Sequence, residues 1–296
     1  MNGPHAGWPG GQRLLLVCTA LLVALAGCSG FEGPDGTAPT PAPTATATSS
    51  PEERWQSGPR IGTPEIRPVN TDPGEVVGPA VETLRAVDAY RVSGTVDVTV
   101  AGADGNQPTR GVVTTSVNRT AMQLRTTSSL GQDGRTEAYL VDGVVYRRDP
   151  GSVATRGTEW VVESSTDPAA WFNRHDELGA HRVMLEHATA DVVGTQQVSG
   201  GYAYRLALDV DVAALNDFYG FDDRRGVDRV EATVWIRPST DRLVRAAGTV
   251  HRPMVVDGRT VDATVEYEKS FSYTSVTISL PAAADSAVAV NATAGT

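Results

Sequence analysis

Apolar residues recur at every second position through much of the chain between residues 91 and 280, and this period is typical of half-buried β-strands. In the first stretch, Val92, Val96 and Val98 share one face while polar side chains occupy the other. The same alternation predicts strands at residues 91–100, 112–118, 121–127, 135–141, 144–148, 158–163, 191–198, 202–210, 228–237, 242–252, 260–268 and 275–280. Short turns separate them, and Asp142-Gly143 is typical of a type I′ hairpin.

The spacing changes to that of helices at residues 79–88, 168–173, 176–188 and 211–219. The first helix is expected to begin at Pro79. A longer helix that starts at Asp72 stays open, although Pro79 would interrupt its hydrogen bonds. Together the elements predict an α+β domain with a single highly curved antiparallel sheet, a half-open β-barrel. The N-terminal helix and the helical insertions would cover its concave face.

An apolar run at residues 14–25 follows the single charge of Arg13. It is shorter than the ~20 residues that cross a bilayer, but it suits the h-region of a signal peptide. The run ends in Leu25-Ala26-Gly27-Cys28, which resembles the lipobox of bacterial and archaeal lipoproteins. The resemblance implies that residues 1–27 are removed and that Cys28 carries the lipid anchor. The alternative is an ordinary signal peptide followed by a bystander cysteine.

Composition changes after the anchor. Residues 28–75 are rich in Thr, Pro and Ala, and residues 37–51 contain no charge and no large apolar side chain. Such a segment cannot bury enough surface to fold, so we expect a disordered tether. The domain is expected at residues 76–281, followed by a flexible C-terminal tail at 282–296.

The chain has a net charge of −10, and Lys269 is its single lysine. This acidic, arginine-rich composition resembles that of proteins from salt-loving archaea, and it argues against nucleic-acid partners and against adhesion to anionic lipid. Cys18 would leave with the signal peptide. The mature chain would then keep Cys28 alone, without a disulfide, a cysteine zinc site or a thiol nucleophile.

Catalytic and metal-binding motifs are missing from the sequence. It contains no HExxH, GxSxG, GxxxxGK[ST] or dinucleotide-binding glycine motif. His175, His181 and His187 are spaced six apart and are expected at the surface or its boundary, and the acidic pair Asp222-Asp223 lacks the spacing of a calcium loop. We therefore expect no enzyme, metal or cofactor. Two glycosylation sequons begin at Asn118 and Asn291.

Three segments resemble the LolA/LppX-LprG group of lipoprotein carriers and lipid-binding lipoproteins. They are YLVDGVVY at residues 139–146 followed by Trp160, VWIRPSTDRLVR at 234–245, and VTISLP at 276–281. Lipoproteins of haloarchaea share this arrangement. The resemblance implies a LolA/LprG-like sheet whose concave side holds an apolar ligand beneath covering helices.

These inferences lead to a membrane-anchored extracellular lipoprotein, without enzymatic activity, that binds a lipid or another apolar ligand on the outer face of the cell membrane. The candidate lid and lining residues are Trp171, Phe172, Phe218 and Tyr219 in the helical insertions, and Val96, Val98, Leu124 and Val234 on inward strand positions. The alternative is that they fill the core of an interaction or envelope-sensing module. A cavity of several hundred Å³ would favour ligand binding, whereas a packed interior with an exposed apolar patch would favour the module.

Overall fold

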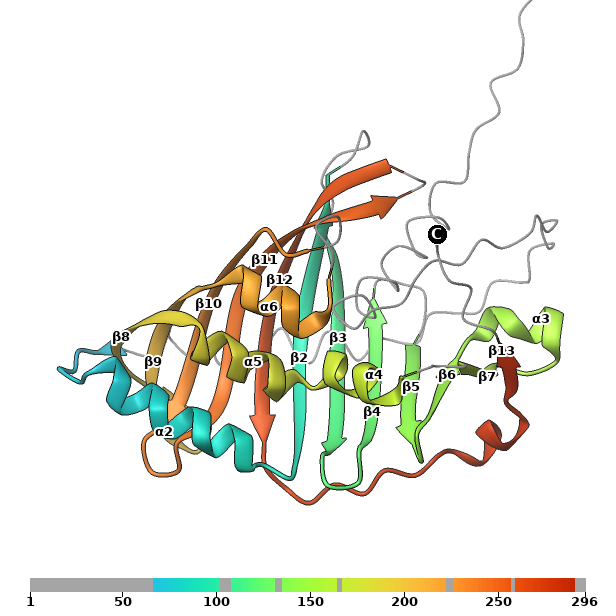
Figure 1. Ribbon diagram of the computed structural model, residues 1–296, viewed down its shortest axis with the longest axis horizontal. Helices are drawn as coiled ribbons and strands as arrows, with labels where there is room; N and C mark the ends of the chain where they lie inside the picture. Colours follow the sequence, from blue (N-terminus) through green and yellow to red (C-terminus); the bar gives the residue numbers. More distant parts are fainter. Residues whose placement is uncertain are drawn as a thin grey trace, which may run out of the picture.

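A computed structural model describes residues 66–101, 108–130, 135–163, 167–221, 226–256 and 259–290. They form one sheet of 13 strands in the order β1-β8-β9-β10-β11-β12-β2-β3-β4-β5-β6-β7-β13. Neighbouring strands are antiparallel except for β13, which runs parallel to β7. The sheet is curved and not closed, and helices α2, α4, α5 and α6 lie along one face of it (Figure 1). We call this the helix-covered face and the opposite side the outer face.

The strands are β1 Ile66–Arg67, β2 Ala89–Val100, β3 Thr109–Asn118, β4 Gln123–Leu130, β5 Arg135–Val141, β6 Val144–Arg148, β7 Trp160–Glu163, β8 Ala188–Val198, β9 Gly201–Val210, β10 Arg229–Arg237, β11 Arg242–Val256, β12 Arg259–Ser272 and β13 Val288–Val290. The helices are α2 Pro73–Ala86, η2 Pro150–Ser152, α3 Val153–Arg156, α4 Pro168–His175, α5 Glu177–Glu186, α6 Val212–Tyr219 and η3 Ala282–Ser286. The predicted class, a single curved antiparallel sheet with helices, is confirmed.

Turn chemistry places several elements where the sequence predicts them. Asp142 and Gly143 both have positive φ, at 51° and 74°, as a type I′ turn between β5 and β6 requires. Asp211 caps α6 by accepting a hydrogen bond from the backbone N–H of Ala213 at 2.9 Å. Both hairpin strands begin and end at the predicted residues.

The prediction that the first helix starts at Pro79 is wrong. It begins at Pro73, and the side chain of Asp72 accepts a hydrogen bond from the backbone N–H of Gly74 at 2.7 Å. Pro79 lies inside α2 on its exposed side and has no N–H to donate to the carbonyl of Glu75, four residues earlier. Glu75 is exposed as well. Because water reaches that carbonyl, the interruption is tolerated and the cap determines where the helix starts.

The C-terminal segment also differs from expectation. Residues 275–280 form no strand, although Val276 and Ile278 are buried on one side as their alternation predicts. The segment runs past the end of β3, where the Asn118 side chain donates to the carbonyl of Val276, and packs with Tyr139 and Trp160 into a second, smaller core (Figure 1). The prediction of a frayed tail after Pro281 is wrong for residues 282–290, because η3 follows and β13 pairs with β7.

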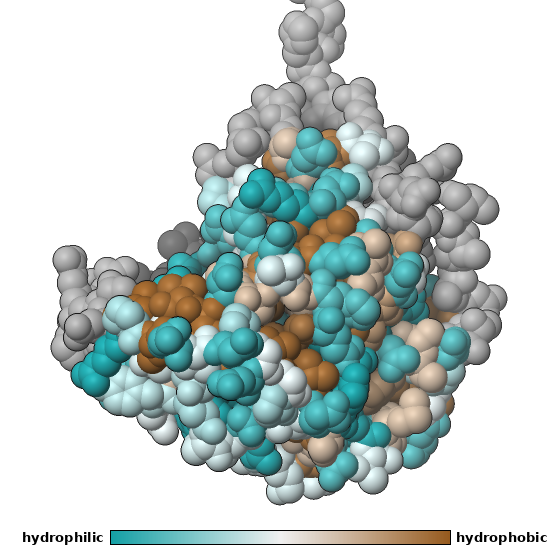
Figure 2. All heavy atoms as spheres, turned by 60° about the vertical axis from the view of Figure 1, so that its left-hand side comes forward, coloured by the Kyte–Doolittle hydropathy of each residue, from teal (hydrophilic) through white to brown (hydrophobic). Residues whose placement is uncertain are grey.

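The main core lies between the helices and the helix-covered face of the sheet. It joins the inward residues of the strands to the apolar sides of α2, α4, α5 and α6. Seen from the β8 end, the surface mixes hydrophilic side chains with separate apolar patches (Figure 2). Exposed large apolar side chains of the described residues come from different parts of the fold, namely Val112, Met122, Val153, Val193, Tyr202 and Val288.

Candidate functional site

A partly open cleft lies between the helices and the sheet and contains about 60 Å³ of free space. Apolar and threonine side chains form most of its walls, with Val96 and Val113 on the sheet and Ala180, Met184 and Leu215 on the helices. Its polar lining residues are Arg174, His175, Glu177, His181, Tyr267 and Lys269. The cleft is therefore an apolar space with a group of charged and polar side chains.

An ion pair joins α5 to the sheet inside this cleft. Lys269 Nζ on β12 lies 2.6 Å from Glu177 Oε2 in the first turn of α5. Lys269 follows Val265 and Tyr267 on the inward side of its strand, so its long side chain is directed under the helix. Burial by itself would raise the pKa of Glu177, but the nearby charge of Lys269 outweighs burial and lowers that pKa. Glu177 is therefore ionised at neutral pH.

Two histidines behind the ion pair are buried and neutral. His181 Nδ1 donates to the carbonyl of Glu177 at 2.7 Å, and burial together with the charge of Lys269 lowers the pKa of His181 to about 4. His175 Nδ1 donates in the same way to the carbonyl of Trp171, whose ring stacks on the imidazole at 3.7 Å. Burial lowers the pKa of His175 to about 4 as well. The expectation of surface or boundary positions is wrong for both histidines, because His175 is 8% exposed and His181 is 2% exposed.

Some buried polar atoms around the cleft have no hydrogen-bond partner among the described residues. They include Arg174 Nε, His181 Nε2 and the Tyr267 hydroxyl oxygen. Because His181 Nδ1 carries the proton, its Nε2 is an acceptor, whereas Arg174 Nε–H is a donor and the Tyr267 hydroxyl can be either. These atoms can bind a polar group that reaches the cleft.

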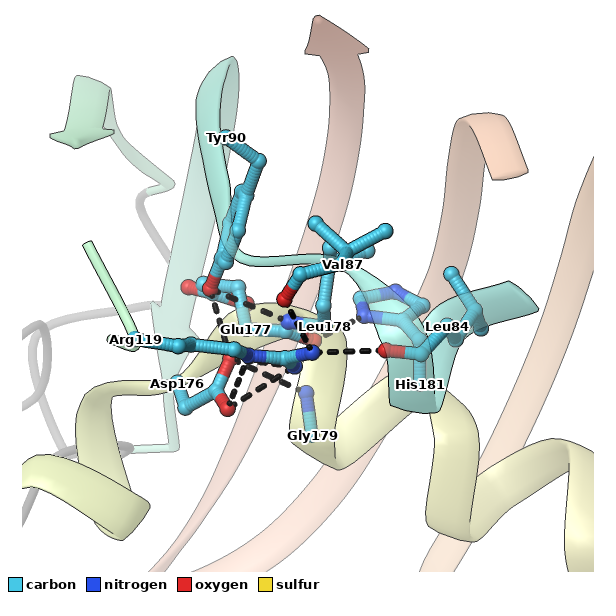
Figure 3. Close-up of polar contacts among 9 residues, drawn as sticks. All are labelled: Leu84, Val87, Tyr90, Arg119, Asp176, Glu177, Leu178, Gly179 and His181. Carbon is cyan, nitrogen blue, oxygen red and sulfur yellow. Dashed lines mark hydrogen bonds and ion pairs between the residues drawn. The ribbon is translucent and has the colours of Figure 1, made fainter. Parts of the chain in front are cut away.

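A second polar group, the Arg119 cluster, holds the helices in place (Figure 3). Arg119 follows β3 and binds Asp176, the N-cap of α5, through Nε–Oδ2 and Nη2–Oδ1 hydrogen bonds of 3.0 Å each. Its Nη1 donates to the carbonyls of Leu84 at 2.6 Å and Val87 at 3.3 Å, at the end of α2. The Tyr90 hydroxyl on β2 donates to Asp176 at 2.7 Å. One arginine thus joins α2, α5 and the sheet.

Some of the predicted lining and lid residues line the cleft, and the others lie outside its lining. Val96 and Tyr219 line the cleft. Trp171, Phe172, Val98, Leu124 and Val234 are buried in the main core and do not line it. Phe218 is half-buried and meets Tyr219 edge to face at 5.1 Å, outside the lining. Two of the four aromatic residues expected to form a lid, Trp171 and Phe172, therefore pack as core.

Sequence reasoning missed the polar lining. Tyr267 falls on the inward face that the alternation predicts, and Lys269 continues the same register two residues later. The sequence signal for this site was therefore the single lysine of the chain at an inward position of a strand. The pairing with Glu177 could not be anticipated, because it depends on how α5 crosses the sheet.

The remaining predicted sites are only partly within the structure. Cys28, Asn291 and Asp222-Asp223 lie outside the described residues. Asn118 is half-buried at the end of β3, where its Oδ1 accepts from the backbone N–H of Ala121 at 3.0 Å. Glycosylation there stays a prediction.

The described residues contain no group of three or more side chains that could hold a metal ion. Within the same ranges no helix is long and apolar enough to span a membrane.

The outer face carries an open hollow of about 400 Å³ across β3 and β4. Serine and threonine side chains line it together with Arg125 and Arg135. Arg125 already binds Glu137 at 2.6 Å, so its charge is neutralised within the sheet.

No protein-family model matches the chain, and no curated protein matches it. Solved structures that resemble it include the lipoprotein LppX of Mycobacterium tuberculosis, with 13% identity and a TM-score of 0.42 over 71% of this chain and 100% of that chain. A LolA superfamily protein of Nitrosomonas europaea has 8% identity and a TM-score of 0.28, over 70% of this chain and 96% of its own. A DUF1329 family protein of Desulfovibrio piger has 12% identity and a TM-score of 0.26, over 69% and 94%. The first two belong to the group that the sequence motifs resemble. Similarities of this size do not assign a function to the chain.

Proposed function

We propose that the protein is a membrane-anchored extracellular lipoprotein whose domain binds a lipid or another apolar ligand between α4, α5, α6 and the sheet, without enzymatic activity. The observation that carries this proposal is the cleft itself, a partly open space with largely apolar walls beneath helices. Removing apolar surface from water would drive binding, at roughly 25 cal/mol per Å². The lipobox ending at Cys28 and the Thr/Pro/Ala-rich segment that follows it support the anchoring. The tether predicted through residue 75 must end earlier, because Ile66–Arg67 already pair with β8 and α2 begins at Pro73.

The volume of the cleft determines how a ligand would bind. The free space of about 60 Å³ is far smaller than the several hundred Å³ of pockets that enclose a whole ligand. The helices would therefore have to move away from the sheet for a chain to enter. The ligand would bind the open form and shift the population toward it.

The small volume also favours the alternative, a filled-core interaction or envelope-sensing module. Trp171, Phe172, Leu124 and Val234 are packed as core, in agreement with that alternative. Against it, the exposed large apolar side chains of the described residues come from separate elements. Such a distribution does not provide the contiguous patch that a docking module needs.

The deciding experiment fills the cleft with the protein's own side chains. Ala180 on α5 lines the cleft and is 1% exposed, so Ala180→Val would place two additional carbons in the free space. Ala169→Val makes the same change at an exposed position of α4 and is the matched control. The full chain is purified from the membranes of the producing cells, and bound lipid is measured by native mass spectrometry.

We expect the unmodified chain and the Ala169→Val variant to carry an extractable lipid, and Ala180→Val to have lost most of it. A bare protein mass for the unmodified chain, together with no uptake of a fluorescent fatty-acid analogue, would contradict ligand binding and support the filled-core module. Equal lipid content in all three would show that lipid binds elsewhere.

A further inference from the structure

The charges around the cleft differ from those of the chain as a whole. Arg174 and Lys269 contribute two positive charges to its lining and Glu177 contributes one negative charge, while His175 and His181 are neutral. The lining thus has a surplus of positive charge in a chain with a net charge of −10. An anion gains Coulomb energy from this surplus in a partly desolvated space, whereas a cation is repelled.

Hydrogen-bond donors in the same cleft lack acceptors. Arg174 Nε–H and the Tyr267 hydroxyl are buried without a partner among the described residues. Lys269 has three N–H donors, and its ion pair with Glu177 is a single contact of 2.6 Å. Lys269 Nζ also lies 5.0 Å from the centroid of the Tyr267 ring, so two of these donor side chains are neighbours. Unsatisfied buried donors favour a ligand that brings oxygen acceptors.

From these observations we propose that the cleft binds the anionic oxygen head group, carboxylate or phosphate, of an amphiphile. Arg174 and Lys269 provide the charged contacts, and the Tyr267 hydroxyl donates a hydrogen bond. This inference rests on the proposed function and names the class of its ligand. The free space of about 60 Å³ suits a head group, and the chain would lie between the helices and the sheet. The charges of Arg174, Lys269 and Glu177 leave the lining with one net positive charge, which suits a head group with a single negative charge.

The test uses three amphiphiles with the same saturated chain: a fatty acid, its monoglyceride and an alkyltrimethylammonium ion. Inorganic phosphate alone is the fourth probe. Binding to the full chain held in amphipol is measured by equilibrium dialysis, with amphipol alone as the blank. Because the head group is the single difference among the amphiphiles, their order of affinity reports the charge preference of the cleft.

Three variants assign the contacts. Arg174→Gln removes a charge, Tyr267→Phe removes one hydroxyl, and Tyr202→Phe makes the same hydroxyl deletion on exposed β9, outside the cleft. Thermal unfolding checks that each variant is folded.

We expect the fatty acid to bind at least about tenfold more tightly than the monoglyceride, and the alkylammonium ion to bind most weakly. Tyr267→Phe should weaken the fatty acid by about five- to tenfold, as the loss of one hydrogen bond from a neutral donor to the anion, and Arg174→Gln by about tenfold or more, because its donor is also charged. Tyr202→Phe should change nothing.

Each contrary result has a separate meaning. If the three amphiphiles bind equally and Arg174→Gln has no effect, the inference fails and the proposed function stands. If no amphiphile binds, both fail. If inorganic phosphate binds as tightly as the fatty acid, the head-group assignment is overturned in favour of a simple anion site.

Discussion

Replacing Arg119 tests whether one buried arginine holds the helices on the sheet. Arg119→Met keeps the length of the apolar stem and removes every hydrogen bond of the guanidinium. The loss includes both contacts with Asp176 and those with the carbonyls of Leu84 and Val87. The Asn118 sequon is unchanged, because its middle position accepts methionine.

The cost can be worked out from the burial of the pair. The side chains of Arg119 and Asp176 are 17% and 11% exposed, so the substitution leaves a largely buried carboxylate with Tyr90 and the helix N-terminus as its remaining partners. Removing one member of a buried pair costs about 3–5 kcal/mol. The remaining partners place the expected loss near the lower limit, at about 3 kcal/mol. For a domain of this size that loss corresponds to a fall in Tm of roughly 6–12 °C.

The assay is chemical and thermal unfolding of the full chain, followed by circular dichroism at a single salt concentration. Arg125→Met is the matched control, because Arg125 also binds a carboxylate at 2.6 Å but its side chain is 43% exposed. Such a pair contributes about 0–1 kcal/mol. If Arg119→Met costs no more than Arg125→Met, the Arg119 cluster does not hold the helices and the reasoning is refuted.

Three further predictions follow from the same contacts. The free energy of unfolding should fall as the pH drops from about 6.5 to about 4, because His175 and His181 stay neutral in the fold but take up protons when unfolded; each contributes about 3 kcal/mol across that window. Urea titrations at stepped pH measure the free energy of unfolding. His181→Gln should reduce its dependence on pH, and His187→Gln, at an exposed position, is the control. Lys269→Met should destabilise by about 3 kcal/mol by leaving Glu177 unpaired, and the double variant with Glu177→Gln should recover most of that loss; no recovery would refute the pairing. Ending the chain after Pro281 should cost about 2 kcal/mol by uncovering Trp160 and the edge of β7, and an unchanged Tm would show that the segment is dispensable.

The sheet was predictable because its determinants are local. Alternation identified which residues of β2, β10 and β12 face the core, and the Asp142-Gly143 turn fixed the register of one hairpin. At the start of β9 the alternation is wrong, because Tyr202 is exposed and Ala203 is buried. The start of α2 is set by the Asp72 cap, and Pro79 does not end the helix because it lies on the exposed side. The C-terminal segment was not predicted because residues 282–290 are mostly small, and their contacts with Tyr139 and Trp160 join positions far apart in sequence.

The site was less predictable for a related reason. Alternation marks Val96, Leu124, Val234 and Lys269 alike as inward, but it does not show which inward positions meet a helix and which meet a gap. Val96 reaches the cleft, whereas Leu124 and Val234 are covered. The difference comes from where α5 crosses the sheet, and long-range contacts decide that.

Those contacts join the stability of the helices to the chemistry of the cleft. The N-cap of α5 and the residue after it, Asp176 and Glu177, each bind a cation of the sheet, Arg119 at 2.9 Å and Lys269 at 2.6 Å. Lifting α5 to admit a chain would break both ion pairs, but only Glu177 and Lys269 line the cleft. Loosening the Arg119 pair should therefore ease opening without changing the head-group contacts, whereas altering the Lys269 pair changes both. A ligand that binds the open form would then bind Arg119→Met more tightly, despite the lower stability of that variant, because less of its binding free energy is needed to open the helices.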